Sequence, residues 1–286
     1  MKISNMLESG KITLSFEVFP PKDSTKFEQV RNACSEIATL KPDFMSVTYG
    51  AGGGTSDYTA EIASLLSSQG IPSVAHLTCV NSSIEHIDSV LELLKQKNIE
   101  NVLALRGDIQ PDVPERAFQY AYQLVEHIKA KRPELCIGAA CYPEGHIESA
   151  DRDEDLTHLK RKVDCGCDFL TTQMFFDNSV LYGFLYRALK KGIDIPVIPG
   201  IMPIMNARQI EKSCAMSGSQ LPPKLKVIID RYADKPDSLR EAGIIYACEQ
   251  IIDLIANGIQ AVHIYTMNKP EVAKAFVSNL SNILER

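Results

Sequence analysis

The sequence predicts a parallel α/β barrel built from eight strand–helix units, and three observations predict it. Short apolar runs recur eight times along the 286 residues, and longer segments with helical periodicity separate them. The runs are almost continuously apolar, which is typical of parallel strands covered on both faces. Eight such units in a chain of this length fit a closed (β/α)8 barrel better than an open sheet.

The eight predicted strands are taken in chain order. They are 12–19, 43–49, 72–79, 101–108, 136–143, 169–176, 195–201 and 261–268. The segments between them have helical patterns: in 84–98, for example, five aliphatic side chains fall on one face. The gap from 202 to 260 has room for an extra helix at 222–234 before a helix at 237–257. Because no linker or change of composition divides the chain, we expect one catalytic barrel over 1–286 without a separate regulatory domain.

Composition and charge exclude several classes of protein. The sequence is 45% hydrophobic and 23% charged, as in ordinary globular domains, and its net charge of −6 argues against nucleic acid or an anionic membrane as partner. No apolar run approaches the length of about eighteen residues that a membrane span needs, and the first residues do not resemble a signal peptide. We therefore expect a cytoplasmic protein whose eight cysteines are mostly buried, reduced thiols, with no metal site.

Polar side chains stand at the ends of seven of the eight predicted strands. Such side chains in apolar strands cost free energy unless they are paired or functional, and the strand ends of a barrel meet at one face. Each has a structural alternative: Glu17 could form a buried ion pair with Arg106 or another buried cation, and His76 could be a satisfied core histidine. Their convergence favours a functional site. They include Glu17, Thr48, Tyr49, His76, Thr78, Arg106, Asp108, Tyr142, Thr171, Thr172, Gln173, Tyr265 and Thr266.

The glycine-rich stretch TYGAGGGTSD at 48–57 follows the second predicted strand. It fails the dinucleotide-binding pattern G-x-G-x-x-G, because Thr55 occupies the sixth position. We expect it instead to let a flat ring approach the backbone, and Thr55, Ser56 or Asp57 to cap the next helix.

A charged segment follows the fifth predicted strand. Arg161 and Lys162 lie six and seven residues after Asp155, about two helical turns away. One interpretation is a solvated helix face with i,i+4 ion pairs. The other is that Arg161, Lys162 and Arg106 hold the phosphates of a cofactor.

Eight motifs in order from about residue 12 to residue 270 resemble methylenetetrahydrofolate reductases of the compact bacterial type. They are SFEVFPPK, SVTYGAGG, HLTC, ALRGD, CYPEGH, LKRKVDCGCDFLTTQMFFD, PGIMPI and YTMNK. The resemblance implies a (β/α)8 barrel with non-covalent FAD that reduces 5,10-methylenetetrahydrofolate to 5-methyltetrahydrofolate in cytosolic one-carbon metabolism and methionine biosynthesis. It also implies a ping-pong cycle in which NAD(P)H and folate use one site in turn.

The resemblance implies roles for individual residues. Glu17 matches the general acid that protonates the substrate, and Asp108 matches a carboxylate near the flavin and the pterin. Gln173 matches an amide that binds folate and nicotinamide. The implied FAD-binding residues are Tyr49, Ala51, His76, Arg106, Gly107, Asp108, Ala121, Tyr142, His146, Asp155, His158, Arg161 and Lys162. The implied substrate-binding residues are Thr48, Asp108, Gln173, Gln209 and Lys269.

Several positions depart from the family's usual pattern. Lys269 stands where bacterial relatives have Arg, and Ser213 stands where an aromatic side chain is expected to pack on NADH. Ser149 and His158 replace Ala and Asn of some relatives. The Ser213 departure leaves open a ferredoxin-linked or partner-subunit electron donor. The competing hypotheses for the whole protein are a flavin-free, pterin-binding methyltransferase barrel and a non-catalytic subunit of an electron-transfer assembly. We expect a homo-oligomer.

Overall fold

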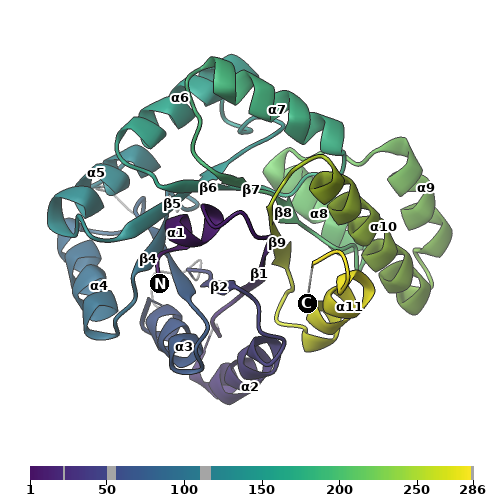
Figure 1. The fold of residues 1–286 in the computed structure, drawn as a ribbon, viewed down its shortest axis with the longest axis horizontal. Coiled ribbons are helices and arrows are strands. Elements are labelled where there is room, and N and C mark those ends of the chain that lie inside the picture. The colour runs from purple at the N-terminus through teal and green to yellow at the C-terminus, as the bar shows by residue number, and fades with distance from the viewer. Residues whose placement is uncertain (22, 50–55, 110–116, 285–286) are drawn as a thin grey trace.

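Nine parallel strands form one sheet that curls into a nearly closed barrel (Figure 1). The computed structural model describes residues 1–21, 23–49, 56–109 and 117–284. The strands are β1 (Thr13–Val18), β2 (Phe44–Val47), β3 (Ser73–Thr78), β4 (Asn101–Leu105), β5 (Cys136–Cys141), β6 (Phe169–Thr172), β7 (Val197–Ile198), β8 (Gly200–Ile201) and β9 (Ala261–Tyr265). Their spatial order is β7-β6-β5-β4-β3-β2-β1-β9-β8.

Helices surround the sheet (Figure 1). In the described part of the chain they are α1 (Ile3–Leu7), the short 3₁₀ helix η1 (Ser24–Lys26), α2 (Phe27–Ala38), α3 (Ser56–Ser68), α4 (Ile84–Gln96), α5 (Ala121–Lys131), α6 (Arg152–Asp164), α7 (Asn178–Lys190), α8 (Ala207–Ser217), α9 (Pro223–Tyr232), α10 (Pro236–Ala256) and α11 (Pro270–Leu280). No helix among these residues is long and apolar enough to cross a membrane.

The barrel closes through a segment that is broken in the middle. Pro199 separates β7, which pairs with β6, from β8, which pairs with β9. Proline cannot donate a backbone hydrogen bond, so the ladder is interrupted there. The adjacent Gly200 is required by space, because a Cβ on it would lie 2.3 Å from the Tyr265 hydroxyl and 2.5 Å from the Thr172 carbonyl oxygen.

Alternation along the strands divides the core into an outer and an inner part. Residues such as Leu14 and Phe16 belong to the large cluster that includes the surrounding helices. A second cluster comprises Ile3, Phe44, Val74, Leu103, Cys136, Phe169, Ile198 and Ala261. Helix α1, which contributes Ile3, lies across one opening of the barrel (Figure 1) and is fixed by a bond from the Ile3 amide to Asn101 Oδ1. Polar side chains therefore concentrate at the other end, where the strands finish.

Short polar side chains start the helices that carry site residues. Asp151 accepts hydrogen bonds from the amides of Asp153 and Glu154 and starts α6. Asp155 and Lys162 are seven residues apart on that helix, so they share the face toward the barrel. Asn206 caps α8 in the same way.

The predicted α/β class and parallel barrel-like sheet are confirmed. Each predicted strand contains an observed strand, but 195–201 is split and the segment at 169–176 leaves the sheet after Thr172. The extra helix at 222–234 and the helix at 237–257 correspond to α9 and α10. Helix α1 is not predicted by the sequence pattern, because five residues are too few to show a period.

Candidate functional site

The central cleft opens where the strands end, and it contains most of the polar strand-end residues. Its volume is about 460 Å³. Its lining comes from seven strands and the loops that follow them, and includes Glu17, Phe19, Thr48, Tyr49, His76, Arg106, Gly107, Asp108, Tyr142, His146, Thr172, Gln173 and Tyr265. Convergence of these residues, predicted from the sequence, is therefore a feature of the structure.

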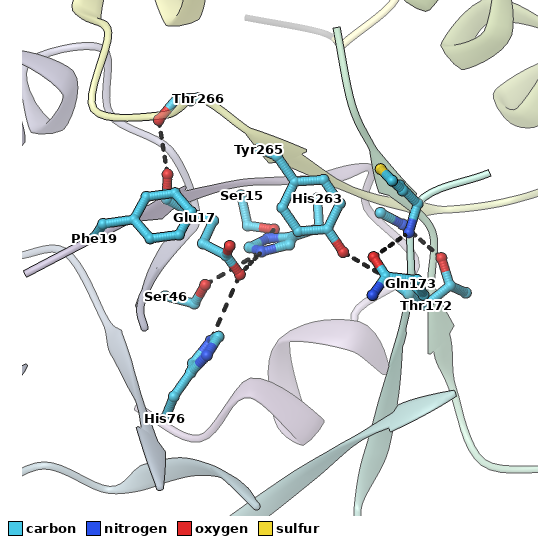
Figure 2. A network of polar contacts seen from close by, with 12 residues as sticks. Ser15, Glu17, Phe19, Ser46, His76, Thr172, Gln173, His263, Tyr265 and Thr266 are labelled. Carbon is cyan, nitrogen blue, oxygen red and sulfur yellow. Dashed lines mark hydrogen bonds and ion pairs between the residues drawn. The ribbon is translucent and has the colours of Figure 1, made fainter. Parts of the chain in front are cut away.

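Glu17 lies in the wall of the central cleft, with 8% of its surface exposed. The strand register places it opposite Ser46 of β2 and Tyr265 of β9. Its Oε2 atom is 3.5 Å from His263 Nε2 and 3.7 Å from His76 Nε2 (Figure 2). Arg106 is not among its ion-pair partners, so the structural alternative of a Glu17–Arg106 pair is not what the described residues show.

His76 has an unusual environment for a histidine. Burial lowers the pKa of its imidazole to about 4, although the Glu17 carboxyl acts in the opposite direction. The ring is therefore neutral near pH 7. Its Nε2 atom is buried and has no hydrogen-bond partner among the residues that the structure describes. An orphaned buried nitrogen facing a carboxyl in a cleft wall is a feature of a ligand site rather than of a satisfied core.

The wall formed by β6, β8 and β9 is held by hydrogen bonds between side chains and backbone. The Tyr265 hydroxyl donates to the Thr172 carbonyl oxygen at 2.7 Å (Figure 2). The Thr172 hydroxyl oxygen accepts from the Gly200 amide at 2.8 Å. The Gln173 carbonyl oxygen of the side chain accepts from the Met174 amide. Burial raises the pKa of the Tyr265 phenol well above its usual value, so this group remains a hydrogen-bond donor.

The carboxylate of Asp108 stands at the exposed side of the central cleft. Its backbone oxygen accepts a hydrogen bond from Asn81 Nδ2 at 2.7 Å. Gly107 before it has φ +83°, and a Cβ there would lie 2.9 Å from Thr78 Cβ. This turn therefore needs glycine and sets the direction of the aspartate.

A second cavity, the side pocket, adjoins the central cleft beside α5 and α6. Its volume is about 320 Å³. It is lined by Ala104, Leu105, Arg106, Tyr120, Ala121, Tyr122, Ala140, Cys141, Tyr142, His146, Glu148, Ser149, Glu154, Asp155, His158, Leu159 and Lys162. Five of these residues also line the central cleft, namely Leu105, Arg106, Ala140, Tyr142 and His146. The two cavities therefore share a wall.

The side pocket contains groups of both charges, the buried Asp155 and the half-buried Lys162. Lys162 Nζ donates to the Ala140 carbonyl oxygen at 2.5 Å, and burial lowers the pKa of its ammonium group. Burial raises the pKa of the Asp155 carboxyl, while Lys162 opposes that change. At the shared wall the Arg106 guanidinium is paired with the Glu148 carboxylate, with Nη2 and Oε1 2.8 Å apart. An elongated anionic ligand that extends from the central cleft into the side pocket would pass close to two cations, Arg106 and Lys162.

Some predicted residues line neither cavity. Arg161 lies over the Tyr122 ring, with its guanidinium carbon 3.7 Å from the ring centroid. Gln209 is exposed in the first turn of α8, and Ser213 is half-buried on the same helix. Lys269 immediately precedes α11. Ala51 and Thr55 lie outside the described residues.

Three residues behind Glu17 are not predicted by the sequence pattern, namely Ser15, Ser46 and His263. His263 contacts Ser15, Ser46 and Glu17 in the barrel interior. A signal existed, because Ser15 alternates with Glu17 and His263 alternates with Tyr265, which puts all four on one face. An interior serine or histidine is not visibly different from an ordinary core residue when only the sequence is read.

The fold and site together define a barrel enzyme class: a cleft at the carboxyl ends of parallel strands holds a buried acid and adjoins a pocket with cations. A family model described as methylenetetrahydrofolate reductase matches residues 2–281. The chain belongs to the methylenetetrahydrofolate reductase family.

Individual relatives agree with this assignment. The chain is 38% identical over 291 residues to methylenetetrahydrofolate reductase 1 of Schizosaccharomyces pombe, covering 98% of this chain and 48% of that protein. It is 34% identical over 274 residues to 5,10-methylenetetrahydrofolate reductase of Escherichia coli, covering 95% of this chain and 91% of that protein. The chain thus spans about half the length of its plant and yeast relatives and nine-tenths of its bacterial ones.

A solved structure supports the fold alone. A protein of Clostridium thermocellum, described as binding two copies of 5-methyl-5,6,7,8-tetrahydrofolic acid, superposes with a TM-score of 0.65 at 15% identity, over 100% of this chain and 99% of that one.

Proposed function

We propose that this protein reduces 5,10-methylenetetrahydrofolate to 5-methyltetrahydrofolate, with FAD as cofactor, NAD(P)H as electron donor and Glu17 as general acid. The observation that carries the proposal is the setting of Glu17. This carboxyl lies in the wall of the central cleft, and among the described residues the basic side chains within 4 Å of it are two histidines rather than Lys or Arg. A carboxyl without a permanent cation beside it is suited to hold and release a proton.

The two cavities adjoin and have Arg106 and Lys162 in their walls, which fits an elongated anionic cofactor such as FAD. Arg106 at the shared wall and Lys162 in the side pocket would hold its phosphates, and the other residues that line the two cavities would hold the rest of the cofactor. When bound, FAD supplies a two-electron carrier that can take a hydride from NAD(P)H and give it to the folate. His76 would contribute a neutral nitrogen to the central cleft, and Gly107 in the central cleft and Ala121 in the side pocket would contact the cofactor.

The chain's own residues can supply the proton that the folate needs and can stabilise the positive charge that protonation creates. Protonation of the folate by Glu17 opens the methylene bridge and leaves a cationic iminium on N5, which then accepts the hydride and becomes the methyl group. The Asp108 carboxylate on the cleft's exposed side stabilises that cation. The Gln173 amide positions first the nicotinamide and then the pterin, because both need the same face of the ring.

The remaining parts of the proposal concern the whole molecule. We count β7 and β8 as one broken strand of a (β/α)8 barrel that forms a single domain over 1–286. The family resemblance supports a ping-pong cycle, a cytoplasmic location and a homo-oligomer. Direct reduction by NAD(P)H is preferred over a ferredoxin-linked partner subunit because Thr48 and Gln173 line the same cleft as Glu17.

Anaerobic half-reactions test this function. The wild-type protein is expected to carry a yellow flavin that NADH or NADPH bleaches and that methylenetetrahydrofolate reoxidises. Glu17→Gln should still be bleached by the nucleotide but should lose folate turnover by a factor of about 10² to 10⁴. Wild-type folate turnover in Glu17→Gln would overturn the acid role. A protein that binds no flavin would favour the flavin-free methyltransferase, and bleaching by reduced ferredoxin alone would favour the partner-subunit donor.

A further inference from the structure

The histidine behind Glu17 is held on both ring nitrogens by buried serines. His263 is 2% exposed, Ser15 is 0% exposed and Ser46 is 3% exposed. His263 Nδ1 is 2.8 Å from Ser15 Oγ, and His263 Nε2 is 3.2 Å from Ser46 Oγ (Figure 2). The ring is stacked on Phe44 at 6.1 Å between centroids and meets the edge of Tyr265 at 5.5 Å. These contacts fix the orientation of the imidazole.

The hydrogens of this network can be counted. The Ser15 hydroxyl also lies 3.1 Å from the Val262 carbonyl oxygen, which can only accept a hydrogen bond. If Nδ1 carries the imidazole hydrogen, it donates to Ser15, Ser15 donates to Val262, and Ser46 donates to Nε2. Every hydrogen then has an acceptor. If Nε2 carries it instead, Ser15 must turn from Val262 to Nδ1, and the buried Ser46 hydroxyl loses the acceptor that Nε2 provides. Buried donors are rarely left in that state.

The tautomer of His263 determines whether Glu17 faces a lone pair or a hydrogen on Nε2. With Nδ1 protonated, Nε2 is a bare acceptor, and its one lone pair is shared between the Ser46 hydroxyl at 3.2 Å and Glu17 Oε2 at 3.5 Å. A carboxylate facing a lone pair is repelled, whereas a carboxylic acid can direct its hydrogen toward it. The other charged or titratable groups around this carboxyl are His76 on β3 and the Tyr265 phenol on β9, both neutral near pH 7.

We propose that Ser15 fixes His263 as the Nδ1–H tautomer and thereby keeps the proton of Glu17 on Oε2, at the edge of the central cleft. Ser15 and His263 are positioning residues for the acid. The network does not conduct protons to it, because it ends at the Val262 carbonyl, which neither gives nor takes a proton. This inference rests on the proposed role of Glu17 for its consequence, but the tautomer itself is independent of that role.

Nuclear magnetic resonance of the FAD-loaded, full-length protein with ¹⁵N-labelled histidine tests the tautomer directly. Two-bond ¹H–¹⁵N correlations distinguish a protonated from a bare ring nitrogen, and His263→Gln identifies the signal. We expect protonated Nδ1 in the wild type and in Ser46→Ala, which removes a hydroxyl of the same size from the other side of the ring. In Ser15→Ala the hydrogen should move to Nε2. A wild-type ring protonated at Nε2, or an unchanged ring in Ser15→Ala, overturns the inference.

The kinetic consequence separates positioning from stability. In Ser15→Ala, folate reduction should fall by about tenfold or more while flavin reduction by the nucleotide stays within about twofold, and the pH at which folate reduction declines should move down. An unaltered pH profile with the tautomer changed would overturn the positioning role. If Glu17→Gln retains folate turnover, the proposed function fails on its own, and the tautomer measurement still decides the network.

Discussion

Arg106 and Glu148 form an ion pair at the wall that the two cavities share. The Nη2 and Oε1 atoms are 2.8 Å apart, a second contact joins Nη1 to Oε2, and the side chains are 22% and 55% exposed. Each partner shifts the other: the carboxylate raises the pKa of the guanidinium, and the guanidinium lowers the pKa of the carboxyl. Because Arg106 is also a proposed phosphate ligand, Glu148 and the cofactor compete for the same cation.

This competition predicts that Glu148→Gln binds FAD more tightly. An exposed ion pair contributes up to about 1 kcal/mol, so the dissociation constant should fall by about two- to fivefold. Titration of the apoprotein with FAD measures it. Glu28→Gln, which breaks an exposed pair with Arg31 on α2, is the control and should leave FAD binding unaltered. Weaker binding in Glu148→Gln would show that Glu148 assists the site.

Lys162 and Lys160 offer a matched comparison on α6. Lys162 Nζ lies in the wall of the side pocket, whereas Lys160 forms a surface pair with Asp164. Lys162→Met should weaken FAD binding by about tenfold or more, because it removes a cation beside the ligand's anionic part. Lys160→Met should not. Equal losses in flavin content for the two variants would mean that Lys162 acts on stability alone.

His76 predicts an acid-sensitive contribution to stability. Its pKa is about 4 in the folded protein, against about 6.5 unfolded, so the unfolded chain binds more protons between those values. The free energy of unfolding should therefore decrease as pH falls from about 6.5 toward 4, by up to about 3 kcal/mol from this group. Urea unfolding at several pH values measures it.

The variant His76→Asn shows how much of the pH dependence of unfolding comes from His76. His76→Asn should flatten the decrease between pH 6.5 and pH 4, and His127→Asn should not, because His127 lies outside the barrel and pairs with Asp88. If both variants retain the wild-type slope, the acid sensitivity belongs to other groups.

Two helical glycines predict opposite responses to one added methyl group. A Cβ on Gly243 of α10 would lie 2.0 Å from the Ile204 carbonyl oxygen, whereas one on Gly183 of α7 meets only the end of Arg187 at 3.3 Å. Gly243→Ala should lower the free energy of unfolding by about 1–3 kcal/mol. Gly183→Ala should leave it unchanged or raise it by up to about 1 kcal/mol. Chemical denaturation measures both, and a neutral Gly243→Ala would mean that α10 can shift.

Most of the barrel can be predicted from the sequence, because the strands are continuous apolar runs that differ from the amphipathic helices. The break at Pro199 is also readable in principle, since proline removes a ladder hydrogen bond. Helix α1 is not, because its place depends on Asn101, about a hundred residues away.

The sequence predicts the site as a set of strand ends, and it does not predict the geometry. Strand-end position brings Glu17, His76 and Gln173 into one cleft. The partner of each side chain depends on register and rotamer, so pairing of Glu17 with two imidazoles and of Arg106 with Glu148 had to come from the structure. The predicted FAD and folate contacts of Arg161, Gln209 and Lys269 stay predictions.

The break at Pro199 has a mechanical consequence. Side-chain hydrogen bonds connect β6, β8 and β9 there in place of a continuous backbone ladder. The Thr172 hydroxyl accepts a hydrogen bond from the Gly200 amide, and the Tyr265 phenol donates one to the Thr172 carbonyl. Tyr265 also lines the central cleft. A ligand that contacts the Tyr265 ring therefore contacts the hydrogen-bonded group that closes the barrel. The rate of hydrogen exchange at the Gly200 amide should then report whether the cleft is occupied.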